Sequence, residues 1–308
     1  MEKNQQFAVI GAGLMGHGIA LTLARAGQYV TITDPVDEAR ASVSARIAES
    51  LGLMGESEAR IAKILKKIEI VSSIPGAVGK AVAVFEAAPE KLELKQSIFA
   101  EIEAHAPANC ILASNTSVMP ITKIMAKLQD KTRAIGTHWW NPPHMIPLVE
   151  VIRTKWTSDA TMDFMMALLK DAKKTPVRVE QDVPGFIGNR LQHAMWREAI
   201  NLVERGICDA ESVDTVVKSC FGRRLSVLGP LENADLVGTE LTLDIHSQVL
   251  ADLDGRPGPS PYLEKLVADG KLGMKSGEGF RKWTDEEAAK VRNRVTTHLR
   301  KLDGILEP

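Results

Sequence analysis

The stretch FAVIGAGLMG, Phe7–Gly16, decides the fold of this chain of 308 residues. Four apolar residues lead into three glycines, and a helix-compatible segment follows as far as Gly27. This order of strand, glycine turn and helix matches the dinucleotide-binding fingerprint. Gly11 serves the turn, Gly13 allows close backbone approach to a pyrophosphate, and Gly16 allows the helix to pack on the strand. The sequence therefore predicts an α/β nucleotide-binding unit at this end of the chain.

The acidic residue that follows the next predicted strand indicates which nucleotide is bound. Asp34 closes the apolar run at 29–33 and lies eighteen residues after Gly16. A carboxylate there accepts hydrogen bonds from the adenosine ribose and repels a ribose phosphate, so NAD is favoured over NADP. Leu14 and Met15 of the turn are expected among the cofactor contacts. A glycine turn without a ligand is the alternative, which the agreement of strand, helix and carboxylate disfavours.

Further polar residues follow the strands predicted at 81–85 and 110–113. In a doubly wound sheet the ends of parallel strands line one crevice, so these residues could converge there. The candidates are Glu90, Lys95, Asn115, Ser117 and His138. For each of them a helix cap or a solvated charge is an equal alternative, and Ser117 in particular could be a simple N-cap.

The segment Thr137–Glu150 carries the predicted acid–base chemistry. It places His138 at the end of one predicted strand and Glu150 in a second, with prolines between them that must bend the chain. The bend can return Glu150 towards His138. A carboxylate that holds one imidazole nitrogen fixes the tautomer and stabilises the imidazolium, as a general base near neutral pH requires. The alternative is a partly buried histidine and a glutamate on a solvated face.

The length of the chain and the change from mixed strand and helix patterns to helical patterns alone predict two domains. Residues 1–183 are expected to form a doubly wound, Rossmann-type α/β domain with two helices inserted at about 36–67. Residues 184–308 are expected to form an all-α domain, because long helical patterns dominate after the turn signal Asp182–Gly185. These helices are expected at 186–204, 210–218, 236–250, 262–268 and 285–302.

Composition excludes several classes of partner. The 38 basic and 39 acidic residues almost cancel, so nothing drives the chain towards nucleic acid or a membrane surface. Cys110, Cys208 and Cys220 are too few and too irregular for a disulfide framework, which favours a reducing compartment. No apolar run is long enough for a bilayer, and the polar first residues do not resemble a signal peptide. A cytoplasmic protein is expected.

Taken in order, the motifs resemble the L-3-hydroxyacyl-CoA dehydrogenase family over nearly the whole chain. They are GAGLMG with Asp34, Glu86 to Glu90 with Lys95, SNTS at 114–117, His138 with Asn141-Pro142, LVEV at 148–151, PGFIGNR at 184–190, GPLE at 229–232 and KSGEGF at 275–280. The resemblance implies an NAD-binding domain followed by a helical domain that usually forms a homodimer. It does not by itself identify the substrate.

The resemblance also implies a role for each matching residue. His138 would be the general base that takes the hydroxyl proton as hydride leaves for the nicotinamide, with Glu150 orienting it. Ser117 and Asn189 would hydrogen-bond the reacting oxygen or the neighbouring carbonyl. Glu90 and Lys95 would lie along the cofactor.

Two departures from the acyl-CoA members bear on the substrate. The proline-rich segment Asn141–Glu150 is more similar to relatives that act on small free acids, namely L-gulonate 3-dehydrogenase with lambda-crystallin, and a pyridine carboxylate dehydrogenase of pyridoxine degradation. Arg224 is a cation where acyl-CoA members tend to lack one, and an arginine fork suits a carboxylate. A solvated or capping arginine is the alternative. Trp139 and Trp140 are expected to shape the acid-binding wall.

The sequence thus predicts an NAD-dependent oxidoreductase for a 3-hydroxy acid or a similar small hydroxy or formyl carboxylate. An acyl-CoA ester is the alternative substrate, because KLGMKSGEGF at 271–280 is common in that branch. Arg60, Lys63 and Lys67 form a cationic helix face that could hold the phosphates of coenzyme A, or could merely be solvated.

Two further classes are disfavoured. A non-catalytic, crystallin-like structural protein would not need the intact set of His138, Glu150, Ser117 and Asn189. A metal hydrolase built on His138 and His144 lacks the helical pattern of histidine and carboxylate that such sites use, so no metal is expected.

Overall fold

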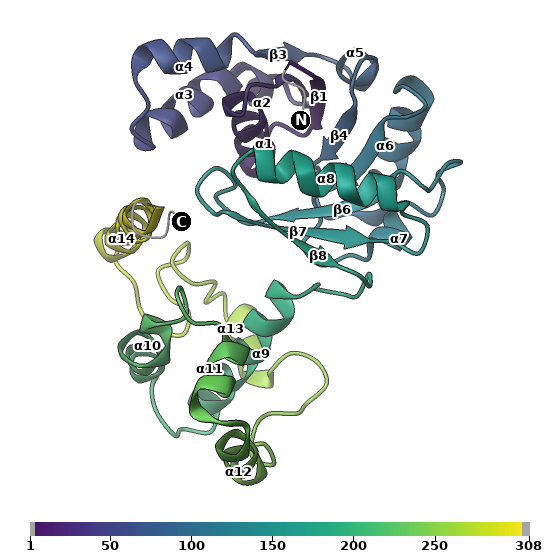
Figure 1. Cartoon of the computed structure of the whole chain (residues 1–308). Coiled ribbons are helices and arrows are strands. Elements are labelled where there is room, and N and C mark those ends of the chain that lie inside the picture. Colours follow the sequence, from purple (N-terminus) through teal and green to yellow (C-terminus); the bar gives the residue numbers. More distant parts are fainter. Residues whose placement is uncertain (1–3, 304–308) are drawn as a thin grey trace. The chain divides into compact units, whose positions relative to one another are not determined.

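The computed structural model describes residues 4–303 (Figure 1). These residues divide into two compact units, one of residues 4–190 with 299–303 and one of Leu191–His298. Two helices, α9 at Gly188–Glu204 and α14 at Asp285–Asp303, carry the chain from one unit into the other. Within the described range, no helix combines the length and apolar character needed to cross a membrane.

An eight-stranded sheet forms the centre of the first unit, in the order β3-β2-β1-β4-β5-β6-β7-β8. Its strands are β1 Gln6–Ile10, β2 Tyr29–Thr33, β3 Ile68–Val71, β4 Ala83–Glu86, β5 Ile111–Ser114, β6 Ala134–Trp139, β7 Leu148–Arg153 and β8 Thr175–Val179. All neighbours are parallel except β6 and β7. The strand order reverses between β1 and β4, which confirms the doubly wound, Rossmann-type fold predicted from the glycine turn.

Helices cover both faces of this sheet. They are α1 Leu14–Arg25, α2 Asp37–Ala41, α3 Val43–Leu53, α4 Glu58–Leu65, α5 Ile74–Val78, α6 Leu92–His105, α7 Ile121–Ile124 and α8 Asp159–Asp171. Along β1, Phe7 and Val9 enter one core cluster, whereas Ala8 and Ile10 enter the other. Because successive strand residues point to opposite faces, a strand covered on both sides reads as a continuous apolar run.

The helical insertion is more divided than the sequence predicts. Two helices are expected at 36–67, but α2, α3 and α4 form there, because the chain breaks at Ser42, whose hydroxyl donates to the Ala39 carbonyl at 3.0 Å. Gly55 has a φ of 84° and turns the chain towards α4, whose N-cap is Ser57. The short elements β3 and α5 follow, and the sequence patterns indicate neither of them.

The second unit is built from helices: α9, α10 Ala210–Ser219, the 3-10 turn η1 Phe221–Arg223, α11 Pro230–Val237, α12 Thr239–Val249, α13 Pro261–Ala268 and α14. One predicted helix, 236–250, is placed differently by the structure. Gly238 has a φ of 100°, which ends α11 and delays α12 until Thr239. Pro230 begins α11 at a position where a proline costs no intrahelical hydrogen bond.

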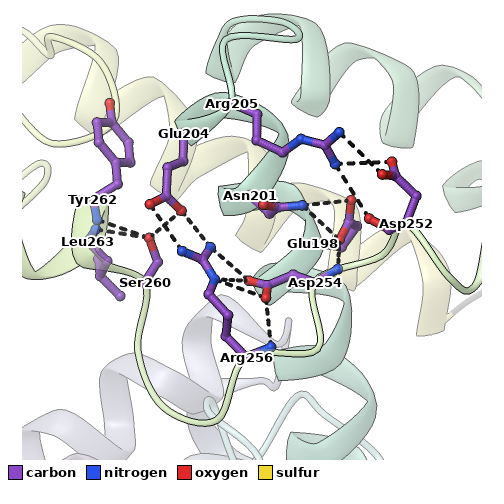
Figure 2. A network of polar contacts seen from close by, with 10 residues as sticks. All are labelled: Glu198, Asn201, Glu204, Arg205, Asp252, Asp254, Arg256, Ser260, Tyr262 and Leu263. Carbon is purple, nitrogen blue, oxygen red and sulfur yellow. Dashed lines mark hydrogen bonds and ion pairs between the residues drawn. The ribbon is translucent and has the colours of Figure 1, made fainter.

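A polar network fastens the loop between α12 and α13 to α9 (Figure 2). Arg256 donates to Glu204 of α9 at 2.6 Å and to Asp254 at 2.9 Å. The Asp254 N–H in turn donates to Glu198 of α9 at 2.8 Å. Because exposed ion pairs add little stability, the network matters mainly for the geometry of the loop.

Replacing Gly16 by alanine should destabilise the first unit. The new Cβ would lie 1.7 Å from the carbonyl oxygen of Gly11, and a backbone atom cannot turn away as a side chain can. The free energy of unfolding in urea should fall by at least about 1–3 kcal/mol. Gly52→Ala is the matched control, because nothing lies within 4 Å of its added Cβ. Equal stability of the two variants would contradict the close packing of α1.

Candidate active site

The bend between β6 and β7 brings His138 and Glu150 together. The antiparallel register pairs the two residues directly, and His138 Nδ1 lies 2.7 Å from Glu150 Oε2. Their side chains are 4% and 1% exposed. In the described part of the chain, no other group hydrogen-bonds to the imidazole. With the Nδ1 proton directed at the carboxylate, Nε2 is the nitrogen available as a base.

The start of α9 holds the other oxygen of Glu150. The N–H groups of Ile187 and Gly188 donate to Oε1 at 2.8 and 3.0 Å. Phe186, with a left-handed φ of 50°, makes this turn, and its ring lies 5.5 Å from the imidazole. Burial alone would raise the pKa of Glu150, but the hydrogen bonds from His138, Gly188 and Ile187 outweigh it and lower that pKa. The carboxylate is therefore ionised at neutral pH and can stabilise an imidazolium.

The two tryptophans after His138 have different surroundings. The Trp140 ring lies 5.0 Å from the imidazole and packs so closely on Gly188 that a Cβ there would be 2.3 Å away. Trp139 is 2% exposed and packs edge-on against Phe85, with ring centroids 6.1 Å apart. Because strand residues alternate between faces, the structure does not bring Trp139 to the imidazole. Trp140 is the tryptophan that lies beside the imidazole, and a wall for a substrate acid stays a prediction.

Four of the predicted polar residues form a connected strip from the end of β5 to α9. Asn189 Nδ2 donates to the Ser117 carbonyl at 2.8 Å, and Glu90 accepts the Ser117 N–H at 2.6 Å. Asn115 Oδ1 accepts the Trp139 N–H at 3.0 Å, which ties the strip to the residue after His138. The structure thus brings these four residues together, Ser117 through its backbone, as expected where the ends of parallel strands line one crevice.

Lys95 lies beneath this strip and is wholly buried. Its ammonium donates to Glu86 at 2.7 Å and to the Ala88 carbonyl at 3.0 Å, and it is 3.8 Å from Glu90. Glu86 is also 0% exposed and accepts the Ser114 hydroxyl at 2.6 Å. A buried ion pair with further hydrogen bonds holds the end of β4 and supports Glu90. A direct contact between Lys95 and the cofactor stays a prediction.

The glycine turn has the features that NAD requires. A Cβ on Gly13 would meet nothing within 4 Å, whereas Gly11 and Gly16 are enclosed by backbone. The helix α1 has neither a side-chain cap nor an acidic residue in its first turn, so its N–H groups are available to an anion. Asp34 Oδ2 accepts the Ala12 N–H at 2.7 Å, which fixes the carboxylate beside the turn. The residues therefore fit a diphosphate and an adenosine ribose.

The remaining cationic candidates, Arg224 and Lys67, differ in whether other groups of the protein hydrogen-bond to them. Arg224 follows η1 in the second unit and is exposed, and no described residue hydrogen-bonds to its guanidinium. Its role as a substrate anchor stays a prediction. On the cationic face, Lys67 donates to Asn4 and to the Gly27 carbonyl, both at 3.0 Å, and stacks on Tyr29 at 4.3 Å. Lys67 is therefore already engaged by two acceptors of the protein.

The sequence patterns do not single out Phe186 or Glu86 as individual site residues. The Pro184-Gly185 turn could have indicated Phe186, because Gly185 has a φ of 75° and Phe186 continues that turn. No spacing rule indicates that Glu86, the last residue of β4, is the buried partner of Lys95.

Comparison with known proteins decides the family. The model of the 3-hydroxyacyl-CoA dehydrogenase NAD binding domain matches residues 6–183, and that of the C-terminal domain matches residues 185–283. The chain belongs to the 3-hydroxyacyl-CoA dehydrogenase family. It is an oxidoreductase that uses NAD, which confirms the family and the cofactor predicted from the motifs.

Relatives of two kinds cover almost the whole chain. A 5-formyl-3-hydroxy-2-methylpyridine 4-carboxylate 5-dehydrogenase of Mesorhizobium japonicum is 34% identical over 309 residues, 98% of each chain. The mitochondrial hydroxyacyl-coenzyme A dehydrogenase of Homo sapiens is 36% identical over 287 residues, 89% of this chain and 90% of the human one. A crystal structure of a 5-formyl-3-hydroxy-2-methylpyridine 4-carboxylic acid 5-dehydrogenase, an NAD+-dependent dismutase, has a TM-score of 0.91 at 32% identity and covers 98% of both chains.

A second histidine of the bend, His144, should make folding stability depend on pH. Its ring lies 6.1 Å from that of His17, and burial, His17 and Lys174 lower its pKa from 6.5 to about 4. Between these two pKa values the imidazole is protonated in the unfolded chain but neutral in the folded chain, so acid favours unfolding. The stability that the neutral imidazole preserves is complete above pH 6.5 and is lost as the pH falls towards 4.

Thermal unfolding between about pH 7 and pH 5 checks this expectation. The Tm of the wild type should fall more steeply than that of His144→Asn. His105→Asn, which removes an exposed histidine of α6, is the control and should follow the wild type. Parallel curves for the wild type and His144→Asn would contradict the expectation.

Proposed function

We propose that the protein moves a hydride between NAD and the hydroxyl carbon of a 3-hydroxy acid or a similar small hydroxy or formyl carboxylate. The observation that carries the proposal is the buried pair of His138 and Glu150, 2.7 Å apart, in the same unit as an open glycine turn. NAD, when bound, supplies the hydride acceptor. The chain belongs to a family of dehydrogenases, and a histidine held by a carboxylate can take the proton that an alcohol loses when it is oxidised.

The roles of the residues follow from charge balance along the reaction. Nε2 of His138 takes the hydroxyl proton, because loss of that proton together with the hydride avoids a protonated carbonyl. Glu150 stabilises the imidazolium that results. Ser117 and Asn189 donate to the oxygen that becomes a carbonyl. The amide of Asn189 has two hydrogens, so it can keep its bond to Ser117 and still donate the other.

A free carboxylate on the substrate is supported by the surroundings of Arg224 and by one of the relatives. Arg224 is exposed with its guanidinium uncommitted among the described residues, and a planar fork binds a carboxylate through two bonds. On the cationic face that an acyl-CoA ester would use, Lys67 is engaged with Asn4 and Gly27, whereas Arg60 and Lys63 are exposed. The Mesorhizobium relative, by its name, acts on a pyridine carboxylate.

We propose further that the protein is a cytoplasmic homodimer that pairs through its second unit. Leu231, Leu236 and Leu243 on α11 and α12 are 80%, 73% and 66% exposed, and a second copy would cover such side chains. The cysteines of the described chain are free, as a reducing compartment favours.

The variant His138→Gln tests the base. Glutamine keeps a polar side chain but cannot take a proton, so kcat should fall about 10²–10⁴-fold. The dissociation constant of NADH, measured by fluorescence titration, should stay within about two-fold, because His138 is not part of the glycine turn. A matching loss of NADH affinity would instead assign His138 a structural role.

A substrate panel tests the acid. NADH production is followed with L-gulonate, L-carnitine, a pyridine hydroxy acid and 3-hydroxybutyryl-CoA. A free acid should be turned over, and Arg224→Ala should raise its KM about 10- to 100-fold, the usual cost of losing hydrogen bonds to a charged group. Arg223→Ala is the matched control, because it removes the same charge from the neighbouring exposed residue.

Two results would overturn the proposal in different ways. Efficient turnover of the CoA ester together with a silent Arg224→Ala would replace the free acid by an acyl-CoA ester. Binding of NADH without turnover of any of these substrates would favour a non-catalytic, crystallin-like role.

A further inference from the structure

An arginine outside the fingerprint bonds directly to the glycine turn. Arg46 of α3 directs Nη2 to the carbonyls of Ala12 and Ala39, the latter at 3.1 Å, and Nη1 to the carbonyl of Gly13 at 3.3 Å. Its Nε donates to the Ser42 hydroxyl at 3.2 Å. The guanidinium thus joins the helical insertion to the two peptide groups at the centre of the turn.

Arg46 has no carboxylate as a direct partner among the described residues. All four of its hydrogen-bond acceptors are neutral, and among residues 4–303 no carboxylate lies within ion-pair distance of it. Arg40, from the neighbouring α2, shows the contrast, because it pairs with Asp37. The positive charge of Arg46 is therefore available to attract an anion to the glycine turn.

The peptide geometry shows how this charge acts on the turn. In a trans peptide the C=O and N–H groups point in opposite directions. When Arg46 holds the carbonyls of Ala12 and Gly13, the N–H groups of Gly13 and Leu14 are directed away from the guanidinium. The Gly13 carbonyl also accepts the first hydrogen bond of α1, from the His17 N–H at 3.2 Å. A hydrogen bond to a carbonyl also polarises the N–H of the same peptide and makes it a stronger donor.

We propose that Arg46 is a positioning residue for the diphosphate of NAD. Its guanidinium fixes the peptides of the glycine turn so that their N–H groups remain directed at the diphosphate, and its positive charge attracts that anion. The proposal rests on the use of NAD and adds a residue of α3 to the cofactor site. Arg46 acts through the backbone and does not touch the reacting atoms.

Equilibrium binding to the full chain tests the proposal, with NADH titrated by fluorescence and with ADP and adenosine as competitors. In Arg46→Gln the affinities for NADH and ADP should each fall about ten-fold, because the N–H groups that bind the diphosphate lose their positioning and a nearby positive charge is removed. The competition constant of adenosine, which has no phosphate, should change less than about two-fold. Arg25→Gln is the matched control: it removes the same charge from the far end of α1, where Arg25 bonds Glu56 at 2.8 Å, and all three affinities should be unchanged.

Arg46→Lys separates charge from geometry. Lysine keeps the charge but not the planar fork, so it should recover only part of the lost ADP affinity. Full recovery of the ADP affinity in Arg46→Lys would contradict a role for the planar guanidinium in holding the two carbonyls. Unchanged NADH and ADP binding in Arg46→Gln, or an equal loss for adenosine, would overturn the proposal as a whole. A wild type that binds no NADH would instead overturn the use of NAD itself.

Discussion

A slip of one residue between β6 and β7 would turn Glu150 to the opposite face of the sheet, because side chains alternate along a strand. The site exists because the antiparallel register sets Glu150 directly opposite His138. The first six strands of the sheet need no such reversal, since parallel strands already bring their ends to one edge. The reversal at β7 adds to that edge a carboxylate that comes from within a strand, where neighbouring strands and the α9 start restrict its movement.

Two opposing effects meet at that carboxylate. Burial by itself disfavours the charged form of Glu150, while three hydrogen bonds to it favour that form and determine the direction of its pKa. Two of the three donors are backbone N–H groups at the start of α9. The ionisation of Glu150 therefore depends on backbone position as much as on the identity of any side chain. The left-handed Phe186 stores a small strain to direct those N–H groups.

The sequence is most informative where chemistry restricts the backbone. The three glycines, Asp34 and the pair of His138 and Glu150 could be predicted because spacing and strand alternation determine where they lie. Trp139 could not be placed in advance, because the exact end of β6 decides which of the two tryptophans faces the imidazole. Arg46 follows no pattern, since a contact from α3 to the turn depends on how the insertion packs.

The sequence patterns also do not predict the burial of Lys95 or the helix break at Gly238. Lys95 has the appearance of a surface lysine in the sequence, and only the packing of α6 on the sheet shows that its ammonium is enclosed with Glu86. The break at Gly238 depends on a positive φ that glycine permits but does not require.

The bonds from the start of α9 to Glu150 have a consequence for recombination between family members. A chimera joined at the predicted domain boundary, residues 183 and 184, would supply Ile187 and Gly188 from one parent to the carboxylate of the other. The compact first unit instead extends to Arg190. A crossover placed after Arg190 keeps the carboxylate, its backbone donors and Asn189 in one inherited segment, so the exchanged part brings its own helices without replacing the groups that hold the base.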